Sequence, residues 1–182
     1  KKILIIGGTG FLGFHFAKHC IKKNFQVISI SRNKPKKIRN LKKVKYIFSN
    51  IADKNKLQAK IKNIENITYV VNFGGEVNHI NRKQTYSSHY QGLKNLLNVL
   101  QTKNIKKFIQ IGSGLEYGKS LSPQNESYIL KPLSNYAKAK SDATKLLIKF
   151  HKKNNFPAII IRPYQVYGPY QDRNRLIPII IN

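Results

Sequence analysis

The sequence has 182 residues, and its 34 lysines and arginines against only 7 aspartates and glutamates give a net charge of +27. This length is enough for one domain with a substantial core, and no run of about twenty apolar residues indicates a membrane span. The lysines are spread over loops and helix ends without interleaved aromatic residues, which favours a solvated surface over a nucleic-acid platform. The single cysteine, Cys20, excludes a disulfide framework and favours a reducing compartment, the cytoplasm; we interpret Cys20 as a packing residue.

The first predicted element is a strand over Lys2–Ile6, which leads into three glycines and a helix over Phe11–Lys22. Gly7 allows a tight turn, Gly10 lets the backbone approach a pyrophosphate, and Gly13 lets the helix lie close to the sheet. Phosphates bound there would meet free N–H groups at the positive end of the helix dipole. The segment therefore predicts a dinucleotide site, with an ordinary structural turn as the alternative.

Apolar strands alternate with helical patterns along the rest of the chain, which is typical of stacked βαβ units and a parallel sheet. Further strands are predicted over 26–31, 44–48, 69–73, 107–111 and 158–162. Further helices are predicted over 54–62, 84–101 and 135–153. We therefore expect an α/β fold of the Rossmann-like, doubly wound type with a mainly parallel sheet, formed as one domain by residues 1–182.

A serine and a Tyr-x-x-x-Lys pair follow the fifth predicted strand. Ser113 comes two residues after the end of this strand, and the four-residue spacing of Tyr136 and Lys140 puts both side chains on one face of a helix. A nearby ammonium group lowers the pKa of a phenol from about 10, and a cationic nicotinamide ring would lower it further. We predict that Tyr136 is a general acid/base and that Ser113 hydrogen-bonds the substrate oxygen. Without the glycines, Tyr-x-x-x-Lys would indicate only an amphipathic helix.

On these residues the chain resembles the extended short-chain dehydrogenases/reductases, the NAD(P)-dependent sugar-nucleotide epimerase/dehydratase group, over essentially its whole length. The resemblance implies a nucleotide-sugar substrate, the catalytic triad Ser113, Tyr136 and Lys140, and no metal. The cofactor-binding residues that it implies are Gly7, Gly10, Phe11, Leu12, Gly13, Asn50, Ile51, Phe73, Gly74, Gly75, Tyr136, Lys140 and Pro163. The substrate-binding residues that it implies are Ser113 and Gln165.

Three residues depart from the family's pattern. Asn50 replaces the acid of an acid–apolar pair that contacts adenine. Gln165 replaces the substrate-contacting Asn of an Arg-x-x-Asn-Val-Tyr-Gly-Pro signature, which covers 162–169 here, and His89 stands where the family usually has Asn. These departures concern the geometry of the substrate site rather than the family.

The cofactor is expected to be NAD or NADP. In the family, an acid at the end of the second strand binds the adenosine ribose and favours NAD, but this strand ends in Ser31 and Arg32. Because Arg32 could pair with a 2′-phosphate, the sequence favours NADP. The alternative is that Arg32 is a surface arginine in a lysine-rich loop.

The segment after Ser113 bears on the reaction. Dehydratases of the family carry an Asp-Glu or Ser-Glu pair directly after the serine or threonine, where this chain has Gly114 and Leu115. Glu116 lies one step further and would face the other side of an extended segment, where an ion pair with a lysine is an alternative to catalysis. Dehydration is therefore disfavoured, and the NADP preference favours 4-keto reduction, with a 4-epimerase as the alternative. From another class, a non-catalytic dinucleotide-binding module is also an alternative.

The resemblance further implies a homodimer built on the helices 84–101 and 135–153. An apolar stripe at helical spacing supports this, with packing on the sheet as the alternative. Its members are Leu93, Leu96, Leu97 and Leu100. Family members continue for a hundred or more residues that build a substrate lobe, so we expect this chain to be a C-terminally truncated fragment.

Overall fold

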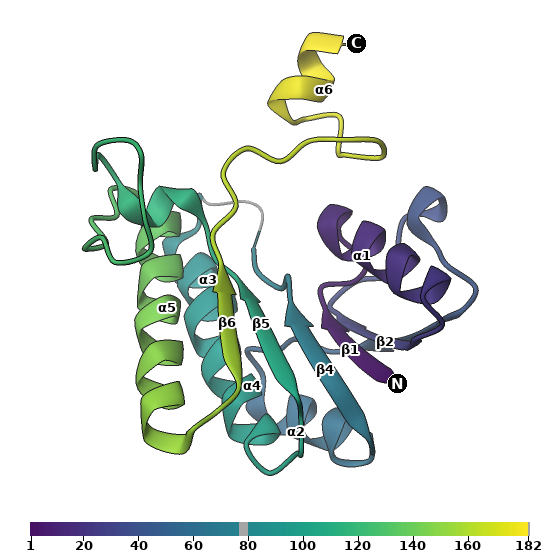
Figure 1. The fold of residues 1–182 in the computed structure, drawn as a ribbon. Helices are drawn as coiled ribbons and strands as arrows, with labels where there is room; N and C mark the ends of the chain where they lie inside the picture. The colour runs from purple at the N-terminus through teal and green to yellow at the C-terminus, as the bar shows by residue number, and fades with distance from the viewer. Residues whose placement is uncertain (77–79, 182) are drawn as a thin grey trace.

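A six-stranded sheet, in which every strand runs parallel to its neighbours, forms the middle layer of the fold (Figure 1). The strands are β1 (Lys2–Ile6), β2 (Gln26–Ser31), β3 (Val44–Phe48), β4 (Ile67–Asn72), β5 (Lys107–Ile111) and β6 (Ala158–Ile161). The computed structural model describes residues 1–76 and 80–181. The strand order β3-β2-β1-β4-β5-β6 reverses direction between β1 and β4, which is the switch point of a doubly wound sheet. The predicted Rossmann-like α/β class is confirmed.

Helices follow most strands, as the alternating pattern predicts. They are α1 (Phe11–Lys22), α2 (Lys54–Lys62), α3 (Arg82–Tyr86), α4 (Gly92–Leu100), α5 (Asn135–Asn154) and α6 (Leu176–Ile181). Short 3₁₀ turns cover Lys37–Arg39 and Gly114–Tyr117, and a π-helical turn covers Ser87–Gln91. Three helices begin after a polar residue whose side chain accepts a hydrogen bond from the backbone N–H three residues later. These residues are Asp53 before α2, Asn81 before α3 and Ser134 before α5.

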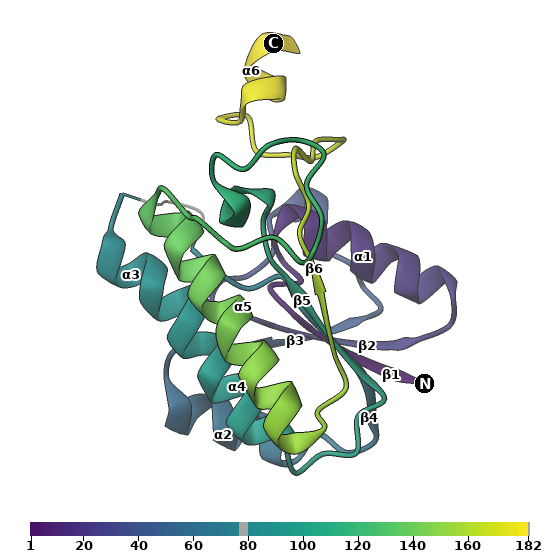
Figure 2. The ribbon, with the colours of Figure 1, turned by 60° about the vertical axis from the view of Figure 1, so that its left-hand side comes forward.

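Helices cover both faces of the sheet, and alternate side chains of β1 pack against the helices on opposite faces. Leu4 and Ile6 belong to a core cluster with residues of α2, α4 and α5, whereas Ile3 and Ile5 pack with residues of α1. Figure 2 shows the same two layers, with α1 on one face and α2, α4 and α5 on the other. Successive residues of a strand point to opposite faces, and burial of each such side chain contributes about 1.5–3 kcal/mol.

The helix predicted over 84–101 is divided into α3, the π-helical turn and α4. The extra residue in the π turn lets the consecutive residues Ser88 and His89 both be buried. Ser88 Oγ accepts the N–H of Glu76 at 2.9 Å and donates to the carbonyl of Thr85 at 3.0 Å. The turn thereby joins this helical segment to the loop after β4.

The leucine stripe of α4 packs inside the molecule. Its members, Leu93, Leu96, Leu97 and Leu100, are at most 1% exposed and belong to the core cluster under the sheet. The exposed residues of α4 are Lys94 and Asn98. The stripe therefore packs on the sheet, as the alternative interpretation held, and offers no apolar surface to a second chain.

The apolar C-terminal segment forms α6, which the sequence pattern did not predict. Figures 1 and 2 show α6 standing apart from the sheet, beyond the carboxyl ends of the strands. None of its described residues is buried. Within 1–76 and 80–181, no helix is long and apolar enough to cross a membrane.

Candidate active site

A cleft of about 920 Å³ opens at the carboxyl ends of the strands, above the switch point between β1 and β4. Loops that follow β1, β4, β5 and β6 contribute to its walls. Most of the predicted site residues line it: Gly7, Gly10, Phe11, Leu12, Gly13, Phe73, Gly75, Ser113, Tyr136, Lys140, Pro163 and Gln165. The fold thus brings together segments that lie up to about 150 residues apart in the sequence, as expected for a ligand site of a doubly wound sheet.

The glycine loop has the geometry of a phosphate cradle. Gly7 adopts a left-handed conformation with φ +78°, and a Cβ on Gly13 would lie 2.7 Å from Cα of Gly8, so the close approach of loop and helix requires glycine. Gly10 caps α1 without any side-chain hydrogen bond, and the first turn of α1 carries no acid. The N-terminus of this 12-residue helix therefore fits an anionic group such as the pyrophosphate of a dinucleotide.

Four predicted cofactor-binding residues lie outside the lining of the cleft. The side chain of Asn50 accepts the N–H of Ala52 at 3.0 Å, and Ile51 is a core residue. A Cβ on Gly74 would lie 2.8 Å from Cγ2 of Ile6, so this glycine allows close packing behind the cleft. The fourth residue, Arg32, has a partner of its own.

Arg32 forms an ion pair with Glu76. The Nη2–Oε2 distance is 2.8 Å, and the side chains of Arg32 and Glu76 are 39% and 11% exposed. Arg32 follows β2 and Glu76 lies beyond β4; both strands pair with β1, so the ion pair spans the end of the strand that carries the glycine loop. The sequence interpretation, in which Arg32 is available to a phosphate, did not include this carboxylate 44 residues away.

Ser113 begins the 3₁₀ turn that follows β5. Its Oγ accepts the N–H of Leu115 at 3.2 Å, and its own N–H donates to Oε1 of Glu116 at 2.8 Å. These two bonds form a capping box, which fixes the backbone and the side chain of the serine together. The same hydroxyl is hydrogen-bonded to Tyr136 and lowers the pKa of that phenol.

Lys140 lies one helical turn after Tyr136 in α5 and is 5% exposed. Its Nζ lies 5.8 Å from the centroid of the Tyr136 ring and donates to the carbonyl of Ile111 at 2.8 Å. Burial lowers the pKa of Lys140 to about 8, and the charge of Glu116 opposes this shift.

The expected effect of Lys140 on Tyr136 is not present in the protein alone. Burial raises the pKa of Tyr136, an effect larger than the lowering by the Ser113 hydrogen bond and by the charge of Arg175, and Glu116 adds to the increase. The physical reason is that the phenol is partly buried while the ammonium of Lys140 donates to a backbone carbonyl instead.

Residues that the sequence interpretation did not name as site residues also line the cleft, among them His89 and Arg175. The His89 ring packs edge-on against Tyr136 at 5.2 Å between centroids, and it fills the space that a side chain on Gly75 would need. A π-helical turn presents His89, and continuous helical periodicity gave no sign of that turn. Only the departure from the family's Asn marked this position.

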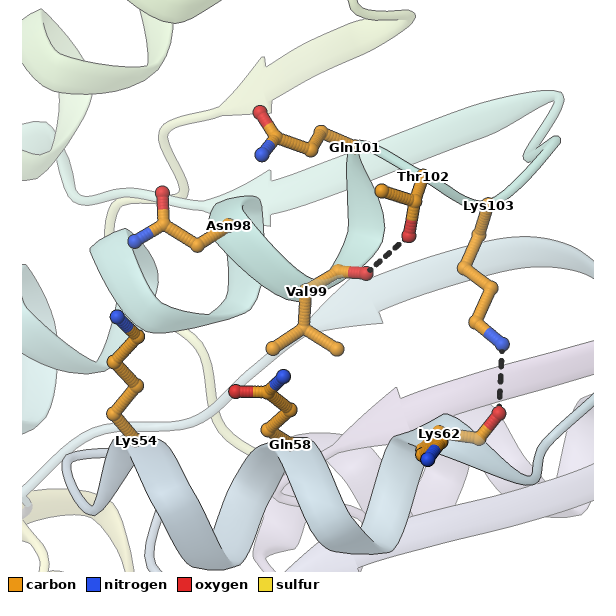
Figure 3. A pocket seen from close by; sticks show the side chains of 8 residues that line it. All are labelled: Lys54, Gln58, Lys62, Asn98, Val99, Gln101, Thr102 and Lys103. Atoms are coloured by element: carbon orange, nitrogen blue, oxygen red, sulfur yellow. Dashed lines mark hydrogen bonds between the residues drawn. The ribbon is translucent and has the colours of Figure 1, made fainter.

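A second hollow, of about 410 Å³, lies between α2 and the end of α4 (Figure 3). Three lysines line it together with neutral polar residues and one valine. The lining residues are Lys54, Gln58, Lys62, Asn98, Val99, Gln101, Thr102 and Lys103. In the described part of the chain, no group of three His, Cys, Asp or Glu side chains is placed to hold a metal ion.

The parallel sheet, the glycine loop before α1 and the cleft over the switch point define a Rossmann-like α/β protein of the nucleotide-binding type. The family follows from the sequence as a whole. Residues 3–182 match the model of the NAD dependent epimerase/dehydratase family, and the chain belongs to that family.

Curated relatives include enzymes of two activities. The chain is 30% identical to a dTDP-D-glucose 4,6-dehydratase of Dictyostelium discoideum, in a match that covers 100% of this chain and 48% of the relative. It is 28% identical to the uncharacterized UDP-glucose epimerase YtcB of Bacillus subtilis, over 93% of this chain and 58% of the relative. The chain thus spans about half to three fifths of the length of these relatives.

Solved structures share the fold. The dTDP-glucose 4,6-dehydratase of Bacillus anthracis, in complex with NAD, matches with a TM-score of 0.86 and 24% identity over 99% of this chain and 60% of that one. The UDP-glucose 4-epimerase of Thermotoga maritima, with UDP-glucose, matches with a TM-score of 0.88 and 23% identity over 96% of this chain and 59% of that one.

Proposed function

We propose that the protein transfers a hydride between a nicotinamide cofactor and a carbon of a nucleotide sugar, and that it does so as a 4-keto reductase. The observation that carries the proposal is the placement of Ser113, Tyr136 and Lys140 in one cleft with the glycine loop before α1. Relatives described as nucleotide-sugar dehydratases and epimerases support the substrate class. A dinucleotide-binding module without catalysis would have no use for this acid–base group.

The residues of the chain would divide the chemistry among them. When bound, the cofactor supplies the hydride to the carbonyl carbon. Tyr136 gives its phenolic proton to the carbonyl oxygen, and Ser113 holds that oxygen by a hydrogen bond. Lys140 favours the phenolate that is left and, by resemblance to the family, binds the cofactor ribose. Burial raises the pKa of Tyr136 in the protein alone, so formation of the phenolate would depend on the Ser113 hydrogen bond, which lowers this pKa, and on the charge of Lys140.

Dehydration is the less favoured reaction because the required acid pair is missing. Gly114 and Leu115 occupy the two positions after Ser113. Glu116 is fully buried and bonded to three donors. The sequence suggested a lysine as the ion-pair partner of Glu116. In the structure the partner is Arg162, whose Nε lies 3.1 Å from Oε2 of Glu116. A carboxylate held in this way is poorly suited to exchange a proton with substrate.

A 4-epimerase is the second candidate, and the Arg32–Glu76 pair favours it. The sequence favoured reduction because it favoured NADP as the cofactor. Binding of NADP through Arg32 requires this side chain to leave Glu76 and pair with the 2′-phosphate. Because Arg32 is already paired with Glu76, binding of the 2′-phosphate would have to compete with this ion pair, which reduces the advantage of NADP over NAD. Solved neighbours that contain NAD include a UDP-glucose 4-epimerase of Thermus thermophilus.

One assay separates these candidates. The full-length protein is incubated with NADH or NADPH and a UDP- or dTDP-linked 4-keto sugar while nicotinamide absorbance is followed. A reductase consumes the reduced cofactor in step with the ketone. An epimerase interconverts UDP-glucose and UDP-galactose without net change in absorbance. Cofactor binding without turnover on either substrate class would establish the non-catalytic module instead.

We also propose a cytoplasmic homodimer built on α4 and α5, although the buried leucines do not supply its interface. The support for the cytoplasm is that the chain has a single cysteine, Cys20, which is buried and free, and the support for the dimer is the resemblance to the family. The exposed faces of these helices carry Lys94, Lys145 and Lys149. Association should therefore strengthen with added salt, and sedimentation at low and high salt tests this; a monomer under both conditions contradicts the dimer.

A further inference from the structure

Glu116 is a buried carboxylate at the junction of three elements. It is 0% exposed. Its Oε1 accepts the N–H of Ser113 at 2.8 Å, and its Oε2 accepts the hydroxyl of Thr144 at 2.7 Å and Nε of Arg162 at 3.1 Å. These donors come from the 3₁₀ turn after β5, from α5 and from the segment after β6. A buried carboxylate that loses such partners is costly, so the arrangement is strongly specified.

Arg162, the ion-pair partner, is itself held in place. Its side chain is 10% exposed. Its Nη1 donates to the hydroxyl of Tyr117 at 2.9 Å, and its guanidinium group lies 5.1 Å from the centroid of the Tyr117 ring. Gly112 leaves room for the pair, because a Cβ there would lie 3.2 Å from Cγ of Arg162. The ion pair is therefore a packed unit beside the cleft rather than a surface contact.

We propose that Glu116 is a positioning residue, which fixes Ser113 relative to α5 and supplies the negative charge that keeps the Lys140 ammonium protonated. The proposal rests on the proposed function of Ser113, Tyr136 and Lys140. Its basis is the set of three hydrogen bonds, which ties the turn bearing Ser113 to the helix bearing Tyr136 and Lys140 through Thr144. Thr144 lies one helical turn after Lys140 in α5.

The negative charge of Glu116 favours the protonated form of Lys140. The Lys140 ammonium donates to the carbonyl of Ile111 at 2.8 Å, and a Cβ on the next residue, Gly112, would lie 2.5 Å from Oε1 of Glu116, so both charges lie against the same stretch of backbone. Burial lowers the pKa of Lys140 to about 8, and Glu116 raises it against that effect. Among the described residues, other charged or titratable groups at this cluster are Arg162, which donates to Glu116, and Tyr117, which accepts from Arg162. His89 from the π turn packs against Tyr136, and Arg175 before α6 acts on Tyr136 through its charge. Removing the carboxylate should therefore lower the pKa of Lys140 further, and removing Arg162 should raise it.

The test measures the protonation of Lys140 directly and needs neither cofactor nor substrate. The full-length protein is pulse-labelled with acetic anhydride across a pH series, and acetylation of the peptide that contains Lys140 is quantified by mass spectrometry. Only the neutral amine reacts, so the midpoint of the profile reports the pKa. We expect a midpoint near 8 in the wild type, and a midpoint about one unit lower in Glu116→Gln.

Matched variants separate charge from packing. Thr144→Val removes a donor to the same carboxylate without changing any charge, so its midpoint should stay at the wild-type value. Arg162→Gln should shift the midpoint upward. If Glu116→Gln does not fold, this shift alone tests whether charge at the Glu116–Arg162 pair controls the protonation of Lys140. Glu116→Asp keeps the charge but shortens the side chain, so it should keep the midpoint and lower turnover. Coinciding midpoints in the wild type, Glu116→Gln and Arg162→Gln would overturn the proposal.

The proposed function has its own readout. NADH binding and turnover are measured on the same wild-type preparation. A wild type that binds no dinucleotide would refute the proposed function, while the acetylation profile would still decide whether Glu116 controls Lys140. A protein that turns over substrate normally in Glu116→Asp would refute the positioning role alone.

Discussion

Two regions of this molecule contain lysines beside a hollow, and only one of them has the features of a catalytic site. In the cleft, Lys140 is 5% exposed and faces a buried network that includes Ser113 and Glu116. In the hollow between α2 and α4, Lys54 and Lys62 are exposed, and Lys103 donates to backbone carbonyls (Figure 3). The net charge of +27 is spread over both regions. Charge alone therefore does not locate function, whereas buried polar groups with required partners do.

The role of Lys103 explains the difference. Its Nζ lies 3.0 Å from the carbonyl of Lys62 and 3.3 Å from that of Ile64, just where α2 ends. A cation at this place satisfies carbonyl groups that lack helical partners and interacts favourably with the helix dipole. Capping of the C-terminus of α2 therefore explains why Lys103 lies beside this hollow. By contrast, the cleft contains the uncapped N-terminus of α1.

The largest expected effect is on proton transfer in the cleft. Tyr136→Phe should lower turnover by about 10²–10⁴-fold, because the phenol is the proton donor in the proposed reaction. Cofactor affinity should change little, since the ring remains. Steady-state rates and NADH titration measure the two effects, with Tyr128→Phe as a matched control in an exposed loop. Turnover at the wild-type rate in Tyr136→Phe would show that another group transfers the proton.

The next effect compares the two lysines directly. Lys140→Ala should reduce both turnover and NADH affinity, because Lys140 is proposed to stabilise the phenolate and to bind the cofactor ribose. A loss of about tenfold or more in affinity is expected for a charge-assisted hydrogen bond. The measurement is NADH fluorescence titration alongside the turnover assay. If Lys140→Ala binds NADH as tightly as the wild type, the ribose contact is excluded.

Part of the fold could be predicted from the sequence, and part could not. Strand β1, the glycine loop and α1 follow from local pattern, because the apolar run, the turn residues and the helical period lie within about twenty residues. The sheet order follows from the βα alternation. The Glu116–Arg162 and Arg32–Glu76 pairs do not, since their members are 46 and 44 residues apart and no local pattern links them.

The sequence predicted most of the residues that meet in the cleft, but not the electrostatic interactions among them. Spacing alone put Tyr136 and Lys140 on one face of a helix, and the structure keeps them there. The raised pKa of Tyr136 depends on burial by segments distant in the sequence. The π turn that buries His89 could not be predicted from the sequence either, because a helical period does not reveal one extra residue in a turn.

A smaller effect concerns the Arg32–Glu76 pair at the edge of the cleft. Glu76→Gln should raise the affinity for NADP relative to NAD by up to about tenfold, because Arg32 then lacks a competing carboxylate. Arg32→Ala should lower the same ratio. Dissociation constants of both cofactors, measured for both variants, check the prediction. A ratio that moves in neither variant would make Arg32 a surface charge without a role in cofactor choice.

The smallest effect is expected in the hollow. Lys103→Ala removes the hydrogen bonds to the carbonyls of Lys62, the last residue of α2, and Ile64, just beyond it, and Lys103 is only partly exposed. We expect the free energy of unfolding to fall by about 0.5–1 kcal/mol, with turnover and NADH affinity unchanged. Urea denaturation and the cofactor titration measure these quantities on one preparation, and Lys54→Ala, which replaces an exposed lysine of the same hollow, serves as the control. A loss of turnover or of NADH affinity in Lys103→Ala would mean that the hollow takes part in function. The contrast between the two regions would then have to be explained by something other than burial.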